Sequence, residues 1–584
     1  MCGIIAITGN NAGTIENGRI DAMLSTLSKR GPDDKGFVRE DRAIIGQTRL
    51  SIVDIGGGHQ PMKDTKNPYT IVFNGEMYGY KDLRGRLELL GHSFSTQSDT
   101  EVILKAYAEY GDACLDQLDG MFVFALWDDI KKELFIARDR FGKKPFYYTF
   151  IDKTFFGASE IKALFATGKI KGKIDPGALE DYLRLSYIPP NKSIYSNIHV
   201  LPPAHVATIK DGNIRMRKYW DLEKKEVSIS FVEAKKTIKK LFDLAVQKRM
   251  VADVEIGSLL SGGIDSTLVT LYAQKYASHP IKTFAVGYDK GVNELPFALE
   301  ASKKIGTDHF TLTAQASDIE ELRNVIEYFD EPHADSSNFP QHLISKLAST
   351  KVKVALSGDG ADELFMGYGW YQKYWNTPLY KKIFENPFSS YRKMVEVFDR
   401  KERAVLIKKR TLIEDEFESL ATSGAVDSFD KINRYDLKIY LPGQLLTKID
   451  RTSMMHSLEV RSPFLDTALV EFVYNLPWKF KINKTENKII LKDILSEIMP
   501  KDFVYRRKQG FGAPIVDWLK EKVLQDEIHK ILTDNAHPMY KYLDRETVRK
   551  IIEKKDRYTK SSIRKIWSIL CLGIWFELHY KDHE

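Results

Sequence analysis

The stretch that most constrains this chain is VEIGSLLSGGIDSTLVTLYAQKY at residues 254–276. Its mostly apolar first part, residues 254–260, starts with a β-branched residue and predicts a buried strand. Two adjacent glycines follow, and they permit a turn and a close approach that side chains would forbid. Asp265 and Ser266 then open an amphipathic run and are typical of residues that cap a helix start. The stretch therefore predicts a strand, a glycine turn and a helix.

These three parts in this order make a site for an anion. Free backbone N–H groups and the helix dipole point at the same place, which favours a negatively charged group there. The motif lacks the Gly-Lys-Ser/Thr ending of a Walker loop, so a kinase or GTPase fits poorly. An ordinary strand-to-helix turn would give the same local pattern, and the rest of the chain must decide between the two interpretations.

Size and composition narrow the class of protein. The 584 residues allow two to four domains, and 43% hydrophobic with 29% charged residues is typical of a soluble globular chain. A net charge of +7 without a dense basic run gives no reason to expect a nucleic-acid partner. Three cysteines cannot make a disulfide framework, and the apolar run at 566–576 is too short to span a bilayer. With no signal peptide before Cys2, we expect a cytoplasmic protein without a membrane partner.

The chain starts with Met1 and Cys2. Removal of Met1 would place a nucleophilic thiol and a free α-amine on one residue, and an amine that titrates near ~8 can act as a base beside the thiol. A buried cysteine in a first strand is the alternative interpretation.

Later segments favour the catalytic interpretation. Arg49 could clamp an amino-acid carboxylate with its guanidinium. Asn74 and Gly75 follow a predicted strand and offer the amide and the unobstructed N–H that an oxyanion hole needs. Glu76 and Asp99 could hold a substrate ammonium. A charged turn, ARDRFGKKP at 137–145, separates two further strands.

In this order, starting from Cys2, these segments resemble the class II glutamine amidotransferases, which are N-terminal-nucleophile glutaminases. The resemblance implies an αββα sandwich over residues 2–210, with Cys2 as the nucleophile and Asn74 and Gly75 as the oxyanion hole. The glutamine-binding residues that it implies are Arg49, Leu50, Ser51, Ile52, Val53, Asn74, Gly75, Glu76 and Asp99. Lys29 stands where the family usually has His, and Gly79 where it usually has Asn, but neither position carries the chemistry.

The pattern loosens after residue 201, and we expect a linker at 221–232 followed by a second domain at 233–584. Strands predicted at 282–288 and 351–356 alternate with helical segments, which favours a doubly wound parallel sheet with ligands at the carboxyl ends of its strands. Residues 400–584 have an all-helical pattern. No internal repeat or low-complexity segment interrupts either half.

Carboxylates gather after the strand at 351–356, in SGDGADE at 357–363. Mg²⁺ bound to nucleotide phosphates usually takes one or two protein carboxylates, and the candidates are Asp265 and Asp362. Helix capping and a solvated face would explain the same acidic residues. A basic cluster, RRKQGFG at 506–512, could supply the cations that a phosphorus transition state requires, although a solvated basic face is the plainer interpretation.

SGGIDS resembles the pyrophosphate loop of the ATP pyrophosphatase superfamily. Together with the glutaminase segments, SGDGADE, DRTSM at 450–454, EVRSPFLD at 459–466 and RRKQGFG, it resembles the glutamine-dependent asparagine synthetases nearly end to end. That resemblance implies that Asp359 is needed to form β-aspartyl-AMP and that Lys508 neutralises the reacting phosphate. The ATP-binding residues that it suggests are Leu260, Ser261, Gly262, Gly263, Asp265, Ser266, Val286, Ser357 and Gly358. Ala361 and Met366 stand where many relatives have glycine.

The activity implied is a two-site reaction. Glutamine hydrolysis at Cys2 supplies ammonia, through an interdomain tunnel expected to be largely apolar, to β-aspartyl-AMP made from aspartate and ATP with Mg²⁺. A paralogue that amidates a sugar acid or a peptide carboxyl group is the nearest alternative. A non-catalytic glutamine or nucleotide sensor is a third, but it should have lost Cys2, Asn74 or the glycine loop. The acceptor, the coupling between the sites and the oligomeric state, for which a homodimer is one option, stay open.

Overall fold

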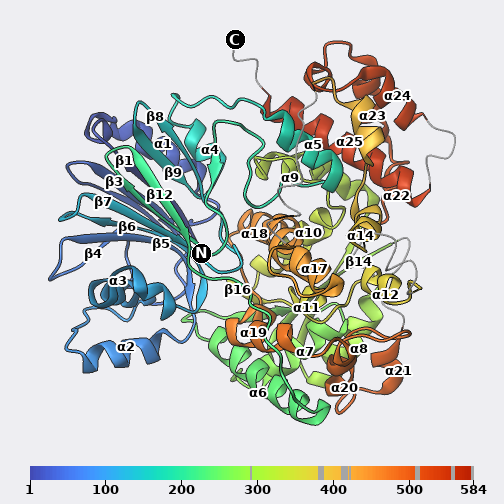
Figure 1. Cartoon of the computed structure of the whole chain (residues 1–584), viewed down its shortest axis with the longest axis horizontal. Helices are drawn as coiled ribbons and strands as arrows, with labels where there is room; N and C mark the ends of the chain where they lie inside the picture. The colour runs from blue at the N-terminus through green and yellow to red at the C-terminus, as the bar shows by residue number, and fades with distance from the viewer. Residues whose placement is uncertain are drawn as a thin grey trace.

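The computed structural model describes residues 1–289, 293–378, 387–409, 419, 422–506, 513–553 and 559–580. Figure 1 shows two lobes, with the sheets of the N-terminal half on one side and the helix-rich C-terminal half on the other. The start of the chain lies where the two lobes meet (Figure 1). The N-terminus is therefore in reach of both halves.

The N-terminal half contains two six-stranded sheets whose strands all pair antiparallel. The first has the order β10-β8-β9-β1-β3-β2 and the second β12-β11-β7-β6-β5-β4. The strands of the first are β1 (Cys2–Thr8), β2 (Asp34–Arg39), β3 (Ala43–Arg49), β8 (Tyr147–Ile151), β9 (Thr154–Ala158) and β10 (His199–Val200). Those of the second are β4 (Met62–Lys63), β5 (Tyr69–Met77), β6 (Gly120–Asp128), β7 (Glu133–Arg138), β11 (His205–Lys210) and β12 (Asn213–Lys218).

Successive side chains on a strand point to opposite faces, so each sheet contributes to one apolar core on its inner face and to another on its outer face. Ile4 of β1 packs with Val72 of β5 and Val123 of β6 in the core between the sheets. On the outer face of the first sheet, Ile5 joins a cluster with helices α1 (Asn17–Thr26) and α4 (Ile161–Phe165). On that of the second, Phe73 joins a cluster with α2 (Tyr80–Leu89) and α3 (Asp99–Tyr110). The predicted αββα sandwich is confirmed.

Between the halves, residues 219–230 form neither helix nor strand. The next helix, α6 (Phe231–Arg249), starts with a capping box between Ser230 and Glu233. The last strand of the N-terminal sheets, β12, extends past residue 210, the expected end of the first domain. The domain limits themselves stay a prediction.

The C-terminal half is built on a five-stranded sheet, order β15-β14-β13-β16-β17, whose pairs are all parallel. Its strands are β13 (Ile256–Leu259), β14 (Lys282–Tyr288), β15 (Asp308–Ala314), β16 (Val354–Leu356) and β17 (Glu459–Arg461). Parallel sheets are normally covered on both faces. Here one buried cluster joins sheet residues to α6 and α7 (Ile264–Gln274), and another joins them to α10 (Asn338–Ser349) and α18 (Thr447–Met454). The predicted strand, turn and helix at 254–276 and the doubly wound sheet are confirmed.

In the described part of residues 400–584, the helices and their connecting loops are interrupted by one named strand, β17, where the sequence pattern wrongly suggested helix throughout. Glu459–Arg461 joins the sheet because it pairs with β16 in parallel register. The remaining α-helices are α5 (Pro176–Leu185), α8 (Leu295–Ile305), α9 (Leu322–Tyr328), α11 (Ala361–Leu364), α12 (Gly369–Trp375), α14 (Pro387–Val395), α15 (Arg400–Leu406), α17 (Ser428–Tyr435), α19 (Thr467–Asn475), α20 (Ile489–Leu495), α21 (Lys501–Tyr505), α22 (Ile515–Trp518), α23 (Lys522–Thr533), α24 (Arg545–Ile552) and α25 (Lys560–His579).

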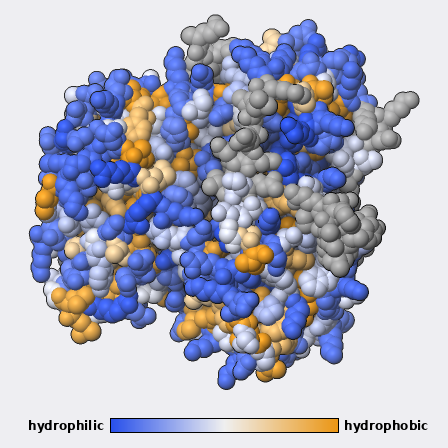
Figure 2. Space-filling view, in the orientation of Figure 1, coloured by the Kyte–Doolittle hydropathy of each residue, from blue (hydrophilic) through white to orange (hydrophobic). Residues whose placement is uncertain are grey.

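Shorter 3₁₀ and π segments connect these elements. The π-helix is η4 (Asp436–Leu446), and the 3₁₀ turns are η1 (Ala12–Thr14), η2 (Gly111–Asp116), η3 (Ala316–Glu321), η5 (Pro463–Leu465), η6 (Trp478–Phe480) and η7 (Pro538–Lys541). Among the described helices, none combines the length and the apolar character needed to cross a membrane. The face in Figure 2 is mostly hydrophilic, with apolar residues scattered over it.

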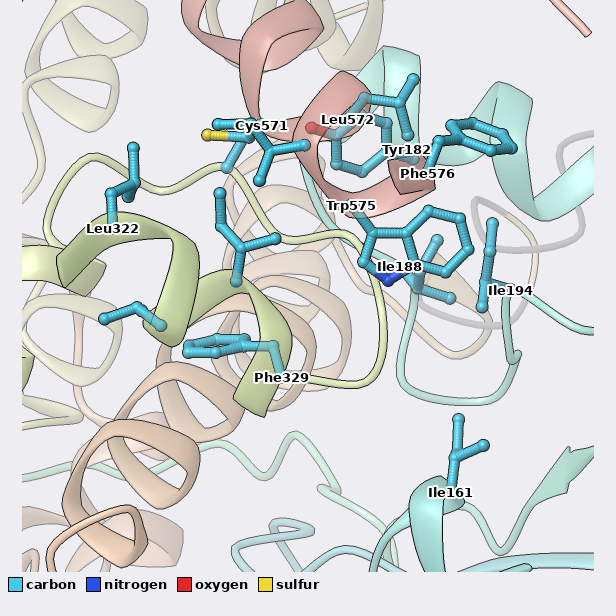
Figure 3. Close-up of a cluster of buried hydrophobic side chains, with 14 of the residues drawn as sticks. Ile161, Tyr182, Ile188, Ile194, Leu322, Phe329, Cys571, Leu572, Trp575 and Phe576 are labelled. Carbon is cyan, nitrogen blue, oxygen red and sulfur yellow. The ribbon is translucent and has the colours of Figure 1, made fainter. Parts of the chain in front are cut away.

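A buried apolar cluster joins the two halves through α25 (Figure 3). Tyr182 of α5 and Ile194 come from the N-terminal half, and Phe329 follows α9. Trp575 of α25 is fully buried among them and donates its indole N–H to the Asp330 carbonyl oxygen at 3.0 Å. The apolar run at 566–576 is thus the buried helix that its length predicted, and it stabilises the contact between the halves.

We predict that Trp575→Ala lowers the free energy of unfolding by about 3–5 kcal/mol, because it removes a large side chain from a closed core and leaves a cavity. Denaturant unfolding followed by circular dichroism measures this change. Leu89→Ala on α2 is the control: Leu89 is 90% exposed, so its loss should change stability by no more than about 0.5 kcal/mol. Equal effects of the two substitutions would contradict the assignment of this core.

Candidate active sites

A cavity opens beside Cys2, at the end of the first sheet where the N-terminal half meets the C-terminal half. It contains all the predicted glutamine-binding residues except Ser51 and Asn74. Its lining residues are Met1, Cys2, Arg49, Leu50, Ile52, Val53, Gly58, Gln60, Phe73, Gly75, Glu76, Ser98, Asp99, Thr100 and Glu459. β1, β3, β5 and the start of α3 supply about half of them and the loop after β3 supplies five more, so the antiparallel pairing of these strands brings the distant segments together.

Asn74 is oriented by the backbone of Cys2. The Cys2 N–H donates to Asn74 Oδ1 at 3.0 Å, which fixes the orientation of the amide. The Nδ2 group of Asn74 is buried and has no hydrogen-bond partner among the described residues. An unpaired buried donor costs free energy unless a ligand uses it. An amide N–H₂ held ready beside a thiol is the donor that an oxyanion requires.

Gly75 lies where no side chain fits. A Cβ atom there would stand 2.1 Å from the Met121 carbonyl oxygen and 2.7 Å from Phe122 Cα, both on the paired strand β6. The residue therefore has to be glycine for β5 and β6 to pair beside the cavity. This is a structural reason that accompanies the predicted oxyanion role.

The C-terminal half reaches into this cavity through β17. Glu459 Oε2 lies 2.9 Å from the ammonium of Met1, and Glu459 Oε1 accepts from Arg461 Nε at 2.7 Å. Arg461 Nη2 lies 3.0 Å from Glu76 Oε2. Glu76, predicted as an ammonium binder, is thus paired with a cation of the other half. The sequence analysis did not place Glu459 and Arg461 at this site; their i, i+2 spacing on a strand, which puts both side chains on one face, was the available signal.

Burial and neighbouring charges shift the pKa values of the carboxyl groups in this cavity. Burial raises the pKa of Glu76 well above its usual range, against the effect of Arg461, and the nearby Asp99 and Glu459 add to the rise. Burial also raises the pKa of Asp99 to about 6, although the Met77 N–H donates to it at 3.0 Å. The pKa of Glu459 is lowered in spite of its burial, because the Met1 ammonium and Arg461 favour its charged form.

Arg49 lines the cavity, but its terminal nitrogens bind the loop that follows β3. Nη2 donates to the carbonyl oxygens of Val53 and Asp54 at 3.0 and 2.8 Å, and Nη1 donates to that of Ile55 at 3.2 Å. The guanidinium therefore shapes the loop that forms one wall of the cavity. Its predicted role as a carboxylate clamp stays a prediction.

A buried ion network at the domain contact was not predicted. Arg30, fully buried, donates to the Cys2 carbonyl oxygen at 3.0 Å and to both carboxylate oxygens of Asp450 at 2.7 and 3.0 Å. It also binds Glu160 at 3.0 Å, and Glu160 lies 2.7 Å from Arg451. Despite burial, the pKa of Arg30 is raised by Asp450 and Glu160. The DRTSM segment thus holds the two halves together behind the candidate nucleophile.

The glycine turn of the C-terminal half has the geometry expected of an anion site. Gly262 has φ +74°, and a Cβ there would lie 2.5 Å from the backbone carbon of Phe297. The Gly263 N–H donates to Ser261 Oγ at 3.3 Å, and the Ser261 N–H donates to Ser266 Oγ at 3.2 Å. Gly263 is the N-cap of α7, and no side chain caps the helix.

The expected capping by Asp265 and Ser266 is therefore wrong. Both residues lie inside the first turn of α7, after the N-cap at Gly263. The hydroxyl of Ser266 is directed back to Ser261, and the carboxylate of Asp265 binds elsewhere. Without a side-chain cap, the N-terminal N–H groups of this helix remain suited to an anion.

The loops after β13 and β16 touch. A Cβ on Gly358 would lie 2.8 Å from Asp265 Cβ and 3.0 Å from the Ser266 nitrogen. The Ser357 N–H donates to the Arg461 carbonyl oxygen at 2.9 Å. Two further predicted ATP contacts, Leu260 and Val286, are buried at the ends of β13 and β14. The structure thus brings the predicted ATP-binding residues to the carboxyl edge of one sheet.

The predicted metal-binding carboxylates meet at a lysine. Lys488 Nζ lies 2.5 Å from Asp265 Oδ2 and 2.6 Å from Asp362 Oδ1. Within the described ranges, no group of three or more His, Cys, Asp and Glu side chains could hold a metal ion. Two carboxylates are nevertheless enough for a magnesium ion that nucleotide phosphates also bind, so the residues fit that use. Lys488 was missed by the sequence analysis because no motif marks it.

Of two further predicted residues, Asp359 and Lys508, the structure describes only Asp359. Asp359 is in the same loop, and burial raises its pKa, while a hydrogen bond from Ser357 and the charge of Lys448 act in the opposite direction. Lys508 lies in 507–512, outside the described residues.

A cavity lies between the halves. It adjoins the Arg30 network through Asp450 and Arg451, and its lining also includes His333 and Gly443. Its walls mix apolar residues with charged ones, unlike the largely apolar path that we expected. The lining residues are Arg138, Gly142, Lys143, Pro145, Phe146, Tyr147, Ile188, Pro189, Pro190, Lys192, Val200, Phe329, Glu331, Pro332, His333, Pro442, Gly443, Leu446, Thr447, Asp450 and Arg451.

Comparisons with known proteins match both halves. The family model "Glutamine amidotransferase domain" matches residues 1–220, and "Asparagine synthase" matches residues 237–579. Asparagine synthetase [glutamine-hydrolyzing] 1 of Bacillus subtilis is 31% identical, over 99% of this chain and 97% of the relative. The corresponding synthetase 3 of that organism is 33% identical over 89% of each. A solved glutamine phosphoribosylpyrophosphate amidotransferase from B. subtilis is 15% identical, covers 53% of this chain and 65% of its own, and has a TM-score of 0.29, which supports no argument.

We predict that Arg30→Met lowers the free energy of unfolding by about 3–5 kcal/mol, because it leaves buried carboxylates without their partner. Glutamine hydrolysis should fall as well, since Arg30 holds the Cys2 carbonyl. The control is Arg42→Met, because Arg42 pairs with Asp211 at the surface, where both side chains are more than a third exposed. That change should cost no more than about 1 kcal/mol. Full stability of the Arg30 variant would contradict the network's role.

Proposed function

This chain belongs to the asparagine synthetase family, and we propose that it transfers the amide nitrogen of glutamine to the β-carboxylate of aspartate at the expense of ATP. The observation that carries the proposal is the presence of two built sites in one chain. One combines Cys2 with the Nδ2 group of Asn74, which has no partner among the described residues, and the other is the glycine turn at the start of α7. A glutamine or nucleotide sensor would need neither a thiol nor an oxyanion donor beside it.

In the first half-reaction, the Cys2 thiolate attacks the side-chain amide carbon of glutamine. Asn74 Nδ2 and the Gly75 N–H hold the oxyanion, ammonia leaves, and the glutamyl thioester is hydrolysed by water. Once Met1 is removed, the nitrogen that now donates to Asn74 Oδ1 becomes the α-amine, which takes the thiol proton. Asn74 then orients the base and stabilises the oxyanion with the two ends of one amide.

Glutamine is held by its own amino-acid group. We assign its ammonium to Asp99 and Glu76, and its carboxylate to Arg49 and the N–H groups of the loop over residues 50–53. Glu459 faces the same cavity and would attract the ammonium as well once the Met1 ammonium is gone. The electrostatic balance among these carboxylates and Arg461 therefore sets the affinity for glutamine.

In the second half-reaction, ATP binds at the carboxyl edge of the parallel sheet. The N–H groups at the start of α7 and the Ser261–Gly263 turn receive its phosphates, while Asp265 and Asp362 would hold Mg²⁺, which supplies charge neutralisation of the phosphates. The aspartate β-carboxylate displaces pyrophosphate to form an acyl adenylate, and ammonia then displaces AMP. Asp359 and Lys508 keep the roles that the family resemblance suggests for them.

The cavity between the halves is our candidate passage for ammonia. It begins beside Asp450, which Arg30 connects to the Cys2 carbonyl, and ends at residues 333 and 443. Neighbouring residues 334 and 444 line a second cavity of the C-terminal half. Because the walls carry charged groups that are already paired, such as Asp450 and Arg451, neutral ammonia can pass without meeting a free acid there.

A larger acceptor carboxylate is the second candidate substrate. The cavity that residues 334 and 444 line has aromatic walls. Trp370, Tyr391, Tyr435, Tyr440 and Trp567 supply these walls. Aromatic faces suit a sugar ring or a peptide side chain better than a small diacid.

We also propose a cytoplasmic location, because Cys2, Cys114 and Cys571 are all buried and unpaired, as in a reducing compartment. The substrates proposed here are small molecules.

The direct test is incubation of the purified protein with glutamine, ATP and Mg²⁺, with and without aspartate. AMP, pyrophosphate and asparagine should form in equal amounts and only when aspartate is present. Glutamate release without aspartate-dependent AMP would keep the glutaminase and favour another acceptor carboxylate.

We predict that Cys2→Ala abolishes asparagine formation from glutamine but keeps it with ammonium salts, since the synthetase site does not contain the thiol. Asparagine is quantified with each nitrogen donor at saturating ATP and aspartate. Cys114→Ala, which removes a buried cysteine that does not line the cavity, is the matched control and should keep both activities. Loss of the ammonia-dependent reaction in the Cys2 variant alone would argue against separate sites.

A pH dependence follows from Asp99. Its pKa of about 6 means that it is ionised, and able to hold the glutamine ammonium, above pH 6 and protonated below it. The kcat/KM for glutamine should therefore fall by up to about tenfold per unit as pH drops below 6. Asp99→Asn should have a low kcat/KM throughout and lack this limb. A wild-type profile that is flat from pH 7 to 5 would contradict the assignment.

A further inference from the structure

The position of Lys488 is unusual for a lysine, because its side chain is buried. Its side chain is 3% exposed, and its ammonium bridges Asp265 of α7 and Asp362 of α11. These helices follow two different strands of the sheet, β13 and β16, so the lysine joins the two loops that form the candidate nucleotide site. Burial lowers the pKa of Lys488, but the two carboxylates raise it by more, and the side chain stays charged.

The surrounding backbone is shaped to let this lysine reach the carboxylates. A Cβ on Gly367 would lie 1.8 Å from Asp362 Oδ1 and 2.1 Å from Lys488 Cε, so only glycine leaves room for the pair. Asn487 Nδ2 donates to the Gly367 carbonyl oxygen at 2.7 Å. Lys488 itself has φ +52°, a left-handed conformation that costs about 1 kcal/mol or more for a side-chain-bearing residue. The backbone of Lys488 is thus strained where its ammonium is placed between Asp265 and Asp362.

A divalent cation and the ammonium would compete for the same oxygens. Mg²⁺ bound with nucleotide phosphates takes one or two protein carboxylates, and the two predicted for this role are Asp265 and Asp362. Lys488 Nζ already lies within 2.6 Å of both. Two cations cannot occupy this position together, and a free ion would have to displace a buried and strongly held charge.

We propose that Lys488 is a built-in counter-cation, which occupies the metal position of the nucleotide-free protein and yields it only to a divalent ion that arrives with ATP. This inference rests on the proposed function, because it takes Asp265 and Asp362 as the carboxylates that meet the ion. Its consequence is an order of binding: the free ion is excluded, and the ion and the nucleotide enter together. The displaced ammonium, at the end of a flexible stem, can then pair with a phosphate oxygen of the nucleotide.

The test measures the binding of Mn²⁺, as a paramagnetic substitute for Mg²⁺, to the full chain without nucleotide by electron paramagnetic resonance. The variant is Lys488→Met, and the matched control is Lys492→Met, one turn later on α20, whose lysine lies over Tyr505. We expect Lys488→Met to bind one Mn²⁺ at least about tenfold more tightly than the wild type and the control. Adding Asp265→Asn to Lys488→Met should remove that site.

Equal nucleotide-free Mn²⁺ binding by the wild type and Lys488→Met would overturn the proposal. A second measurement covers a variant that folds poorly: Mn²⁺ alone should leave the wild-type melting temperature unchanged, whereas Mn²⁺ with ATP should raise it. A rise with Mn²⁺ alone that Asp265→Asn abolishes would also overturn the proposal. Failure of the proposed function is seen separately. In that case, the wild type does not bind ATP with Mn²⁺ and does not form AMP.

Discussion

The contact between the two halves depends on Arg30. Its guanidinium is fully buried, binds the carbonyl of Cys2 on one side, and binds Asp450 of the C-terminal half on the other. A buried charge is tolerated only when it is paired and hydrogen-bonded, so the backbone that presents the thiol reaches its stable arrangement with the C-terminal half in place. The glutaminase centre is therefore assembled by both halves of the chain, although its catalytic groups all come from the first.

The three-residue strand β17 also connects the two halves. It belongs to the C-terminal half, and its side chains contact the candidate glutamine site of the N-terminal half. The side chain of Glu459 lines the glutamine cavity, and Arg461 pairs with Glu76, another residue of its lining. The carbonyl oxygen of Arg461 accepts the N–H of Ser357, in the loop that closes the nucleotide site. A shift of this strand would change both sites together. One short element at the edge of the parallel sheet thus provides a physical route by which occupation of one site can be felt at the other.

The sequence predicted what local geometry determines. Strands alternating with helices gave the doubly wound sheet, and the family resemblance of the N-terminal motifs gave the αββα sandwich. What it did not predict depends on distant packing. The i, i+2 pair Glu459 and Arg461 faces the other half, and Lys488 carries no motif because its partners come from separate loops. Capping at Asp265 was wrong for the same reason, since a lysine more than 200 residues away takes its carboxylate.

The central claim is that one enzyme uses both glutamine and the acceptor, and that ammonia passes between its two sites through the cavity between the halves. Asparagine synthesis from glutamine labelled with ¹⁵N in its amide, in the presence of excess unlabelled ammonium, tests this claim most directly. Mass spectrometry of the asparagine amide then reports the source of the nitrogen. The account predicts that the label is retained at pH values well below the pKa of the ammonium ion, where little of the added pool is free ammonia. Dilution of the label to the composition of the bulk pool would contradict it.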